Sequence, residues 1–464
     1  MENYQADIHP ESIAPQADAL KASTFVSVFD SMIQSSVLEA LCDAHAPVPR
    51  TPPKLTASQV VTGLIYHQLQ TSGTLAQNAF DLHQIGMSDA AFSQRRQGLP
   101  QELFDEIAGA ALSPLADEQK HPDAFYKGLR LVGLDGSQCS VSNTPRLLAA
   151  LPKAASRRLK AAFAKLQIVT LIELGLHNPL AAAVAGSGTG ETTLAKKIWK
   201  HVPDGSLLII DRGFGTTLTL DSAQQAWVGK QVEWLARIRK DIKTEIIERL
   251  SDGSVLVEAV KYKRNKQGKR IKSGKMRMRE IRYEVIGRDG KLSTVRLWTS
   301  LLDAEKYPAL ELAQNYAKRW EHEVAYRELK LDVRSTPLLA SYTMETAQQE
   351  VIAVVLAMAL ITRVRVAAGE TLGVPTLRVS FLKVLQLTQQ LWETFAWSEG
   401  ARSPQLTAQL CEQYFDGLRR RAILPVRRAR SCPRVVCQPV SSWTRKTSQS
   451  ISYGKISLTI LPLP

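Results

Sequence analysis

Four short, nearly continuous apolar runs between residues 128 and 211 limit most what this chain can fold into. The runs are GLRLVGLD (128–135), LQIVTLIELG (166–175), LAAAVAGS (180–187) and SLLIID (206–211). Runs of this length that are rich in Val, Ile and Leu are typical of buried strands. A helical segment, TTLAKKIWKHV (192–202), separates the third run from the fourth. The order β-β-β-α-β predicts an α/β fold, a mixed sheet with helices packed on it.

The regions on either side of these runs have other periods. Between about 216 and 304 the segments WLARIR, SVLVEAVKY, REIRYEVIG and TVRLWTSLL alternate apolar and polar residues, which predicts a second sheet. From about 23 to 115, and again after 307, apolar residues recur at helical spacing. The oily stretch VIAVVLAMALI (351–361) is interpreted as a buried helix. We expect no membrane span, because no apolar run approaches ~18 residues without a charge.

A helix–turn–helix pattern lies within the N-terminal region. TLAQNAFDLHQI precedes Gly86, and MSDAAFSQRRQGL follows it with Ser88 as the expected N-cap. The second helix is predicted to expose Arg95 and Arg96, whose side chains suit contacts with phosphates or base edges. Helix pairs are common in proteins, so an ordinary packed pair is the alternative.

The net charge of +15 is concentrated in two places. Residues 261–282 hold eleven lysines and arginines against one glutamate, and these include Lys269, Arg270 and Lys272. Residues 401–464 hold eleven against two acids. Two local basic patches on a slightly acidic body predict a polyanion partner such as DNA. The alternative is a solvated loop together with a disordered basic tail.

The cysteines and the N-terminus indicate the compartment. Five cysteines are scattered along the chain, and the close pair Cys432 and Cys437 has no partners at zinc-ligand spacing. The first residues, MENYQADIHPESIAP, lack the basic start and apolar core of a secretory signal. We therefore expect a reduced cytoplasmic protein without a zinc site.

Residues 314–330, QNYAKRWEHEVAYRELK, carry charges at helical spacing. At about 100° per residue, Arg319, Glu323 and Lys330 lie about −60°, −20° and −40° from Tyr316. One continuous helix would then present an acid between two cations on a single face. Such a face suits a site that handles phosphate with a metal. A solvated helix with i,i+4 ion pairs would give the same pattern.

Two aspartates accompany the buried strands. Asp135 lies in GLDGS, in or just after the first strand, and Asp211 lies in LLIIDRGFG at the end of the fourth. Ligands gather at such strand ends in open sheets, although Asp-Gly and Asp-x-Gly also begin ordinary turns. If both converge with Glu323, their repulsion requires cations. Carboxylates suit Mg²⁺, and two such ions ~3.5–4 Å apart support phosphodiester chemistry.

With these residues the chain resembles the DDE transposases of the "insertion sequence four" family, whose catalytic core has an RNase H-like fold. That family carries a Y-x2-R-x3-E-x6-K signature. Four residues match every spacing of it: Tyr316, Arg319, Glu323 and Lys330. The segments LDGS, IIDRGF and TSLLD also look like blocks of that family, as does a β-rich insertion between the second acid and the glutamate. The resemblance covers roughly 125–370.

The resemblance implies a role for each matched residue. The ligands of two Mg²⁺ ions, which Mn²⁺ can replace, would be Asp135, Asp211 and Glu323. Arg319 and Lys330 would bind phosphates at the cleaved DNA end, and Tyr316 would hydrogen-bond or stack near it. Some relatives hold a flipped base with a tryptophan of the insertion. Candidates here are Trp227, Trp234 and Trp298, and a core role is expected for Trp298.

Two other features are set aside. GSGTGETT (186–193) looks like a phosphate-binding loop, but Glu191 stands where the Gly-Lys-Ser/Thr ending is required. His322 is adjacent to Glu323, yet it points about 100° away from the charged face.

The predicted architecture is an RNase H-like mixed sheet with flanking helices, interrupted by a β-rich insertion. Its segments are a loose lead (1–22), a helical DNA-binding domain (23–125), the first part of the core (126–215), the basic insertion (216–304), the second part with the catalytic helix (305–370), and C-terminal helices with a basic tail (371–464). We expect a cut-and-paste transposase, a homodimer when joining ends, that acts on terminal inverted repeats and target DNA. The alternatives are a non-catalytic DNA-binding descendant and another RNase H-like nuclease.

Overall fold

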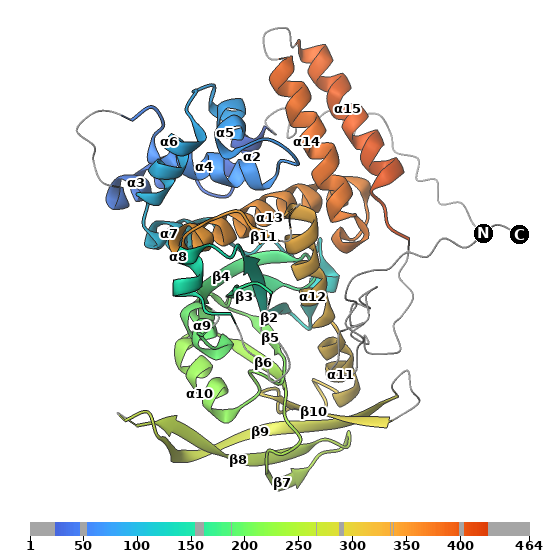
Figure 1. The fold of residues 1–464 in the computed structure, drawn as a ribbon. Coiled ribbons are helices and arrows are strands. Elements are labelled where there is room, and N and C mark those ends of the chain that lie inside the picture. The colour runs from blue at the N-terminus through green and yellow to red at the C-terminus, as the bar shows by residue number, and fades with distance from the viewer. Residues whose placement is uncertain are drawn as a thin grey trace, which may run out of the picture. The chain divides into compact units, whose positions relative to one another are not determined.

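The computed structural model describes residues 24–46, 53–153, 162–186, 188–265, 267–286, 292–334, 336, 338–398 and 403–425 (Figure 1). The chain divides into two compact units. One holds residues 1–283 and 295–427, and the other holds 284–294 and 428–464. The site described below lies within the first unit.

The part of the chain before the sheet is helical, as predicted. Its helices are α2 (Phe25–Asp30), α3 (Ser35–His45), α4 (Ala57–Gln68), α5 (Leu75–His83), α6 (Asp89–Gln97), α7 (Gln101–Ala111) and the short 3₁₀-helix η2 (Pro122–Ala124). Ser88 caps α6 as expected, because its hydroxyl accepts a hydrogen bond from the amide of Ala91 at 3.2 Å. The turn after α5 uses Gln84, in the left-handed region at φ 56°, rather than Gly86.

The expectation that α6 exposes Arg96 is wrong. Its side chain is only 5% exposed and points at helix α13 (Met344–Leu372). Its Nε donates to Oε1 of Gln349 at 3.0 Å, and its Nη2 donates to Oγ of Ser341 at 3.0 Å. Nη2 also donates to the carbonyl oxygen of Thr346. Neighbouring residues on a helix point about 100° apart, so two adjacent arginines cannot both face solvent once α6 packs on α13.

A mixed sheet forms the centre of the fold. Its core strands are β2 (Leu129–Val141), β3 (Lys165–Glu173), β4 (Asn178–Gly186), β5 (Ser206–Ile210) and β6 (Val232–Arg237). Their spatial order is β4-β3-β2-β5-β6. The first three pair antiparallel, and β5 is parallel to both β2 and β6. With α9 (Glu191–Ile198) and η3 (Trp199–His201) before β5, the predicted β-β-β-α-β order is confirmed.

The predicted second sheet is instead a continuation of the first. The added strands are β7 (Glu245–Arg249), β8 (Val255–Arg264), β9 (Arg270–Ile286) and β10 (Leu292–Thr299). β10 pairs antiparallel with β6, with Leu297 opposite Arg237. Alternation of polar and apolar residues predicts strands but not their partners, and the edge of β6 offers backbone groups that need pairing. The short strands β1 (Phe125–Tyr126) and β11 (Leu338–Leu339) pair with β2.

The core between the sheet and its helices contains the tryptophans that were candidates for base binding. The covering helices here are α9 and α10 (Thr217–Ala226), whereas α8 (Pro145–Ala150) contacts α13 (Figure 1). Trp227, Trp234 and Trp298 are 4%, 1% and 0% exposed and belong to this core. The core role expected for Trp298 is confirmed, and in this conformation none of the three presents its ring to a flipped base.

The C-terminal half of the described chain is helical. Its elements are α11 (Ala309–Ala317), α12 (Trp320–Arg327), the π-helix η4 (Glu328–Val333), α13, the 3₁₀-helix η5 (Thr376–Arg378), α14 (Phe381–Trp397) and α15 (Pro404–Arg421). α13 is long and apolar enough to span a membrane, but 83% of its most apolar window is buried in the fold. The interpretation of 351–361 as a buried helix is therefore confirmed.

The single continuous helix expected over 314–330 is interrupted. At the α11–α12 junction, several backbone amides donate to the carbonyl oxygen three residues earlier instead of four. These are the amides of Lys318, Arg319, Glu321 and His322. This tightened segment changes the rotation between Tyr316 and Glu323, and the π-helix changes it again before Lys330. The motif residues therefore come from three helical segments.

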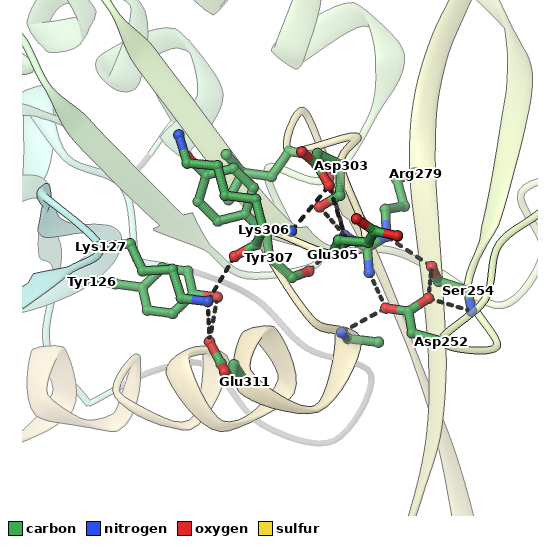
Figure 2. A network of polar contacts seen from close by, with 12 residues as sticks. Tyr126, Lys127, Asp252, Ser254, Arg279, Asp303, Glu305, Lys306, Tyr307 and Glu311 are labelled. Atoms are coloured by element: carbon green, nitrogen blue, oxygen red, sulfur yellow. Dashed lines mark hydrogen bonds and ion pairs between the residues drawn. The ribbon is translucent and has the colours of Figure 1, made fainter.

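Arg279 connects the added strands to the start of α11 (Figure 2). Its guanidinium is fully buried and donates to Oγ of Ser254 at 2.7 Å, to the carboxylate of Asp252 and to the carbonyl oxygen of Tyr307 at 2.7 Å. Asp252 also accepts the amide of Ala309 at 2.8 Å, so it satisfies a free donor in the first turn of α11. Arg279 of β9 and Asp252 of the β7–β8 turn thus fix where α11 begins.

Candidate active site

Asp135 lies on the face of β2 that α12 covers. Side chains alternate along a strand, so Gly133, Asp135 and Ser137 share this face. α12 approaches closely at Gly133, where a Cβ atom would lie 2.9 Å from Nδ1 of His322. Oδ1 of Asp135 accepts the amide of Gly136 at 2.8 Å, and its side chain is 16% exposed.

Asp211 lies beside Asp135 in the sheet register. β2 and β5 are parallel neighbours, and Leu134 pairs with Ile210, so the two aspartates are the next residues on adjacent strands. β5 ends at Ile210, and the chain turns sharply there. The Asp211 carboxylate accepts the amide of Gly213 at 2.7 Å. The sheet thus brings the two acids together. Asp211 directly follows the end of its strand as expected, but Asp135 lies inside its strand, because β2 continues to Val141.

Arg319 joins Asp135 to Glu323. Its Nη1 lies 3.1 Å from Oδ2 of Asp135, and its Nη2 lies 3.2 Å from Oε1 of Glu323. The arginine side chain is 15% exposed and Glu323 is 38% exposed, so the cluster is open to solvent on the glutamate side. One guanidinium therefore lies between the first and third acids of the predicted triad.

The electrostatics of the site show crowding of negative charge. The pKa of Asp135 is raised to about 6, chiefly by burial and also by the neighbouring Asp211 and Glu191, against the opposing effects of Arg319 and the Gly136 amide. Burial acts to lower the pKa of Arg319, but Tyr316 and the acids around it leave that pKa above its ordinary value. The carboxylates thus need a positive charge, and in this state the guanidinium supplies it.

Tyr316 and Lys330 lie at opposite ends of the cluster. Tyr316, at the end of α11, is 7% exposed, and its hydroxyl has no hydrogen-bond partner within the described part of the chain. Burial raises its pKa. Lys330, in η4, donates to Oγ of Ser137 and lies 5.6 Å from the centre of the Tyr326 ring. Burial lowers the pKa of Lys330.

A hydrogen-bonded layer beneath these residues attaches α12 to the sheet. The hydroxyl of Tyr326 donates to the carbonyl oxygen of Asp135 at 2.7 Å and accepts the amide of Thr170 at 3.2 Å. Nε2 of His322 lies 2.8 Å from the Thr170 hydroxyl. Burial lowers the pKa of His322 to about 3, so it is neutral. His322 points away from the acids, as expected.

Glu191 is a neighbour of the acids that the sequence analysis did not assign to the site. It begins α9, and its carboxyl group occupies the space beside Gly136, where a Cβ atom would lie 2.4 Å from its Cδ. Gln167 donates to it at 3.0 Å. Burial and Asp211 raise its pKa. The glycine of the LDGS segment was the available signal, because only glycine permits this approach.

The carboxylates suit a divalent cation chemically but are not yet arranged as a binding site. Within the described ranges, no group of three or more His, Cys, Asp and Glu side chains is placed to hold a metal ion. The acids are hard oxygen donors, and the unpartnered hydroxyl of Tyr316 is a further polar atom beside them. Binding of a metal between Asp135 and Glu323 would require Arg319 to leave.

The basic residues predicted to contact DNA have mixed positions. Lys269 and Lys272, at the β8–β9 hairpin, are exposed, and Arg95 on α6 is partly exposed. The side chain of Arg270 lies outside the described atoms, as does the basic tail beyond residue 425 with Cys432 and Cys437. Contacts of these residues with DNA remain predictions, and Arg96 is excluded by its burial.

Comparisons with known proteins assign the class. Residues 141–360 match the family model described as "Transposase DDE domain", which includes Asp211 and Glu323 and begins after Asp135. The chain is 28% identical over 352 residues to the Escherichia coli transposase InsG of insertion sequence element IS4, covering 75% of this chain and 76% of InsG. It is 31% identical over 209 residues to the transposase-related protein InsZ of the same strain, covering 44% and 68%.

A solved piggyBac transposase synaptic complex with hairpin DNA is similar at a TM-score of 0.41 and 10% identity, over 85% of each chain. The sequence relatives decide the class, which is that of the DDE transposases. The chain belongs to the family of the insertion sequence IS4 transposases, as its Y-R-E-K residues predicted.

Proposed function

We propose that this protein is a cut-and-paste DNA transposase. It binds the terminal inverted repeats of its element, cleaves phosphodiester bonds with the help of Mg²⁺, and joins the freed 3′-hydroxyl ends to target DNA. The observation that supports this most is the contact of Arg319 with both Asp135 and Glu323, beside Asp211. This contact joins two of the three predicted acids, and the third, Asp211, is near enough to raise the pKa of Asp135.

The core is proposed to be RNase H-like. Three antiparallel strands followed by two parallel ones, in the order β4-β3-β2-β5-β6, form its sheet. Asp135 lies within β2, and Asp211 directly follows the parallel neighbour β5, at the carboxyl end where ligands of open sheets gather. β7–β10 would be the insertion between the second acid and the glutamate.

Mg²⁺, or Mn²⁺ in its place, would be held by Asp135, Asp211 and Glu323 as two ions. Such ions supply an activated nucleophile and stabilise the departing oxygen. The protein's own contribution is positional. Arg319 would move from the carboxylates to a DNA phosphate, for which its planar fork is suited, and Lys330 would provide a second positive charge. The free hydroxyl of Tyr316 would bind the same DNA end.

The DNA surface is proposed to include α6 with Arg95, the hairpin with Lys269, Arg270 and Lys272, and the basic tail. Contacts of lysine and arginine with phosphates would give a salt-dependent affinity. Because two ends of the element must be joined, we propose a homodimer in the complex with DNA. The cytoplasm, where bacterial DNA is accessible, is its expected location.

The test is cleavage of duplex DNA that carries the ends of the element, separated on a denaturing gel. Wild type with Mg²⁺ is expected to nick at the element boundary. Glu323→Gln is expected to bind the same DNA without cutting it. The matched control is Glu345→Gln, an exposed glutamate in the first turn of α13, which is expected to cut like wild type.

Two results would contradict the proposal. If wild type binds the ends but cuts in neither Mg²⁺ nor Mn²⁺, the protein is a non-catalytic DNA-binding protein. If it cuts branched DNA without these ends equally well, it is a nuclease of another kind.

A further inference from the structure

A buried ionic cluster lies behind the helix that carries Glu323. We call it the His177 cluster, and its members are His177, Glu321, Glu328 and Arg365. Nδ1 of His177 lies 2.7 Å from Oε2 of Glu328, and Nε2 lies 2.9 Å from Oε2 of Glu321. Ionised carboxylates only accept hydrogen bonds, so with both glutamates ionised both ring nitrogens donate and the imidazole is charged, in line with its raised pKa. Arg365 of α13 contacts Glu328 at 3.3 Å.

Glu321 and Glu328 lie on the face of the helix opposite to the face that carries Glu323. Glu321 and Glu328 are seven residues apart, about 20° from alignment on an ideal helix. Glu323 is about 200° from Glu321, which directs it away from the cluster and toward Asp135. Rotation of α12 about its axis would therefore break the contacts of His177 and move Glu323 together.

His177 is held in place by the turn that carries it. It lies between β3 and β4 at φ 59°, a conformation that is uncommon for residues other than glycine. The buried Glu173 at the start of this turn accepts the amides of Leu115 and Ala116 at 2.8 and 3.0 Å and the side-chain amide of Asn178 at 2.7 Å. The β3–β4 turn is thus held in place by its own hydrogen bonds, and α12 is oriented by its contacts with His177 in this turn.

We propose that His177 is a positioning residue of the transposase reaction, which sets the rotation of α12 so that Glu323 faces Asp135. It touches neither DNA nor the reacting atoms. The inference rests on the proposed function, because it assigns Glu323 a place in the cleavage step. Residues that position a site in this way act on the rate at which bound DNA is cut rather than on DNA affinity.

The experiment is single-turnover cleavage of end DNA at saturating protein and Mg²⁺, with DNA affinity measured separately without metal. His177→Gln preserves side-chain length, and Gln84 shows that glutamine adopts this backbone region in the same chain. The expected result is a cleavage rate at least tenfold below wild type with a Kd for DNA within twofold. The matched control is His121→Gln, a buried histidine 3.5 Å from Glu370 that is not a member of the His177 cluster.

The outcomes separate this inference from the proposed function. If neither wild type nor His121→Gln cuts, the proposed function fails. If both cut and a folded His177→Gln cuts within twofold of wild type, only the positioning role fails. If His177→Gln does not fold, Glu321→Ala tests the positioning role instead. It removes the more exposed carboxylate partner of His177 and leaves the pair of His177 with Glu328. Glu321→Ala cutting at the wild-type rate would then overturn the inference.

Discussion

The guanidinium of Arg319 lies 3.1 Å from the carboxylate of Asp135, a residue on a different secondary-structure element. The same side chain reaches Glu323 at 3.2 Å. In the DNA-free protein, the cation between these two acids is therefore a residue of the chain. Binding of a DNA phosphate by Arg319 would leave the carboxylates without this charge, which couples the arrival of DNA to the readiness of the site for a metal.

Arg319→Gln is expected to bind Mn²⁺ more tightly than wild type in the absence of DNA. Removal of an opposite charge within hydrogen-bond distance of a carboxylate changes its interaction with cations by about tenfold or more. Titration followed by Mn²⁺ electron paramagnetic resonance measures the affinity. Arg327→Gln, an exposed arginine on the same helix, is the control. Equal affinity in all three proteins would show that Arg319 does not compete with the metal.

Substitutions of the two adjacent arginines of α6 are expected to affect different properties, stability for Arg96 and DNA binding for Arg95. Arg96→Gln removes a buried charge that three acceptors bind, and we expect it to lower the free energy of unfolding by about 3 kcal/mol. Arg95→Gln should fold like wild type and lower the slope of DNA affinity against salt by about 1 if it contacts a phosphate. Urea unfolding and binding at several salt concentrations separate the two. A salt-slope change for Arg96→Gln with unchanged stability would contradict its structural role.

Much of the fold follows from local pattern. The strand runs, the cap at Ser88 and the buried helix at 351–361 depend on periodicity and side-chain chemistry within a few residues, and these were predictable. The single sheet was not predictable, because strand periodicity does not say that β10 pairs with β6. The two arginines of α6 were not distinguishable either, since the packing of α13 decides which is buried.

The site was predictable to the extent that its residues stand in a motif. Asp135, Asp211 and Glu323 were selected by strand ends and helical spacing. The contact of Arg319 with two acids, the approach of Glu191 to Gly136 and the charged pair partners of His177 required the tertiary structure. They join residues whose separation in sequence carries no local signal.

Arg279→Met is expected to destabilise the protein more than the same substitution of any exposed basic residue on this strand. It leaves Asp252 without its cationic partner and removes the hydrogen bonds that the guanidinium donates to three carbonyl oxygens. Loss of one member of a buried ion pair costs about 3–5 kcal/mol. Lys275→Met, on the same strand, removes only exposed ion pairs and should unfold near the wild-type midpoint. Both are compared by denaturant unfolding. Equal midpoints for the two variants would show that the network in Figure 2 is not stabilising.

The stability that the His177 cluster contributes depends on pH. Burial and the positive Arg365 act to lower the pKa of His177, but Glu328 and Glu321 outweigh them and leave this pKa above its ordinary value. His322, which is neutral, is a further titratable neighbour. A group with a raised folded pKa stabilises the protein fully below its unfolded pKa of about 6.5. That stabilisation is lost as the pH rises through the folded value.

The free energy of unfolding of wild type is therefore expected to fall, relative to that of His177→Gln, as the pH increases from about 6.5. Urea unfolding of both proteins at closely spaced pH values measures the difference between their free energies of unfolding. Groups that titrate alike in the two proteins do not contribute to this difference. A difference that stays constant across this range would mean that His177 does not lose its proton there. A difference that grows with pH would mean that the imidazole is neutral in the folded protein, and the charged cluster would then be wrong.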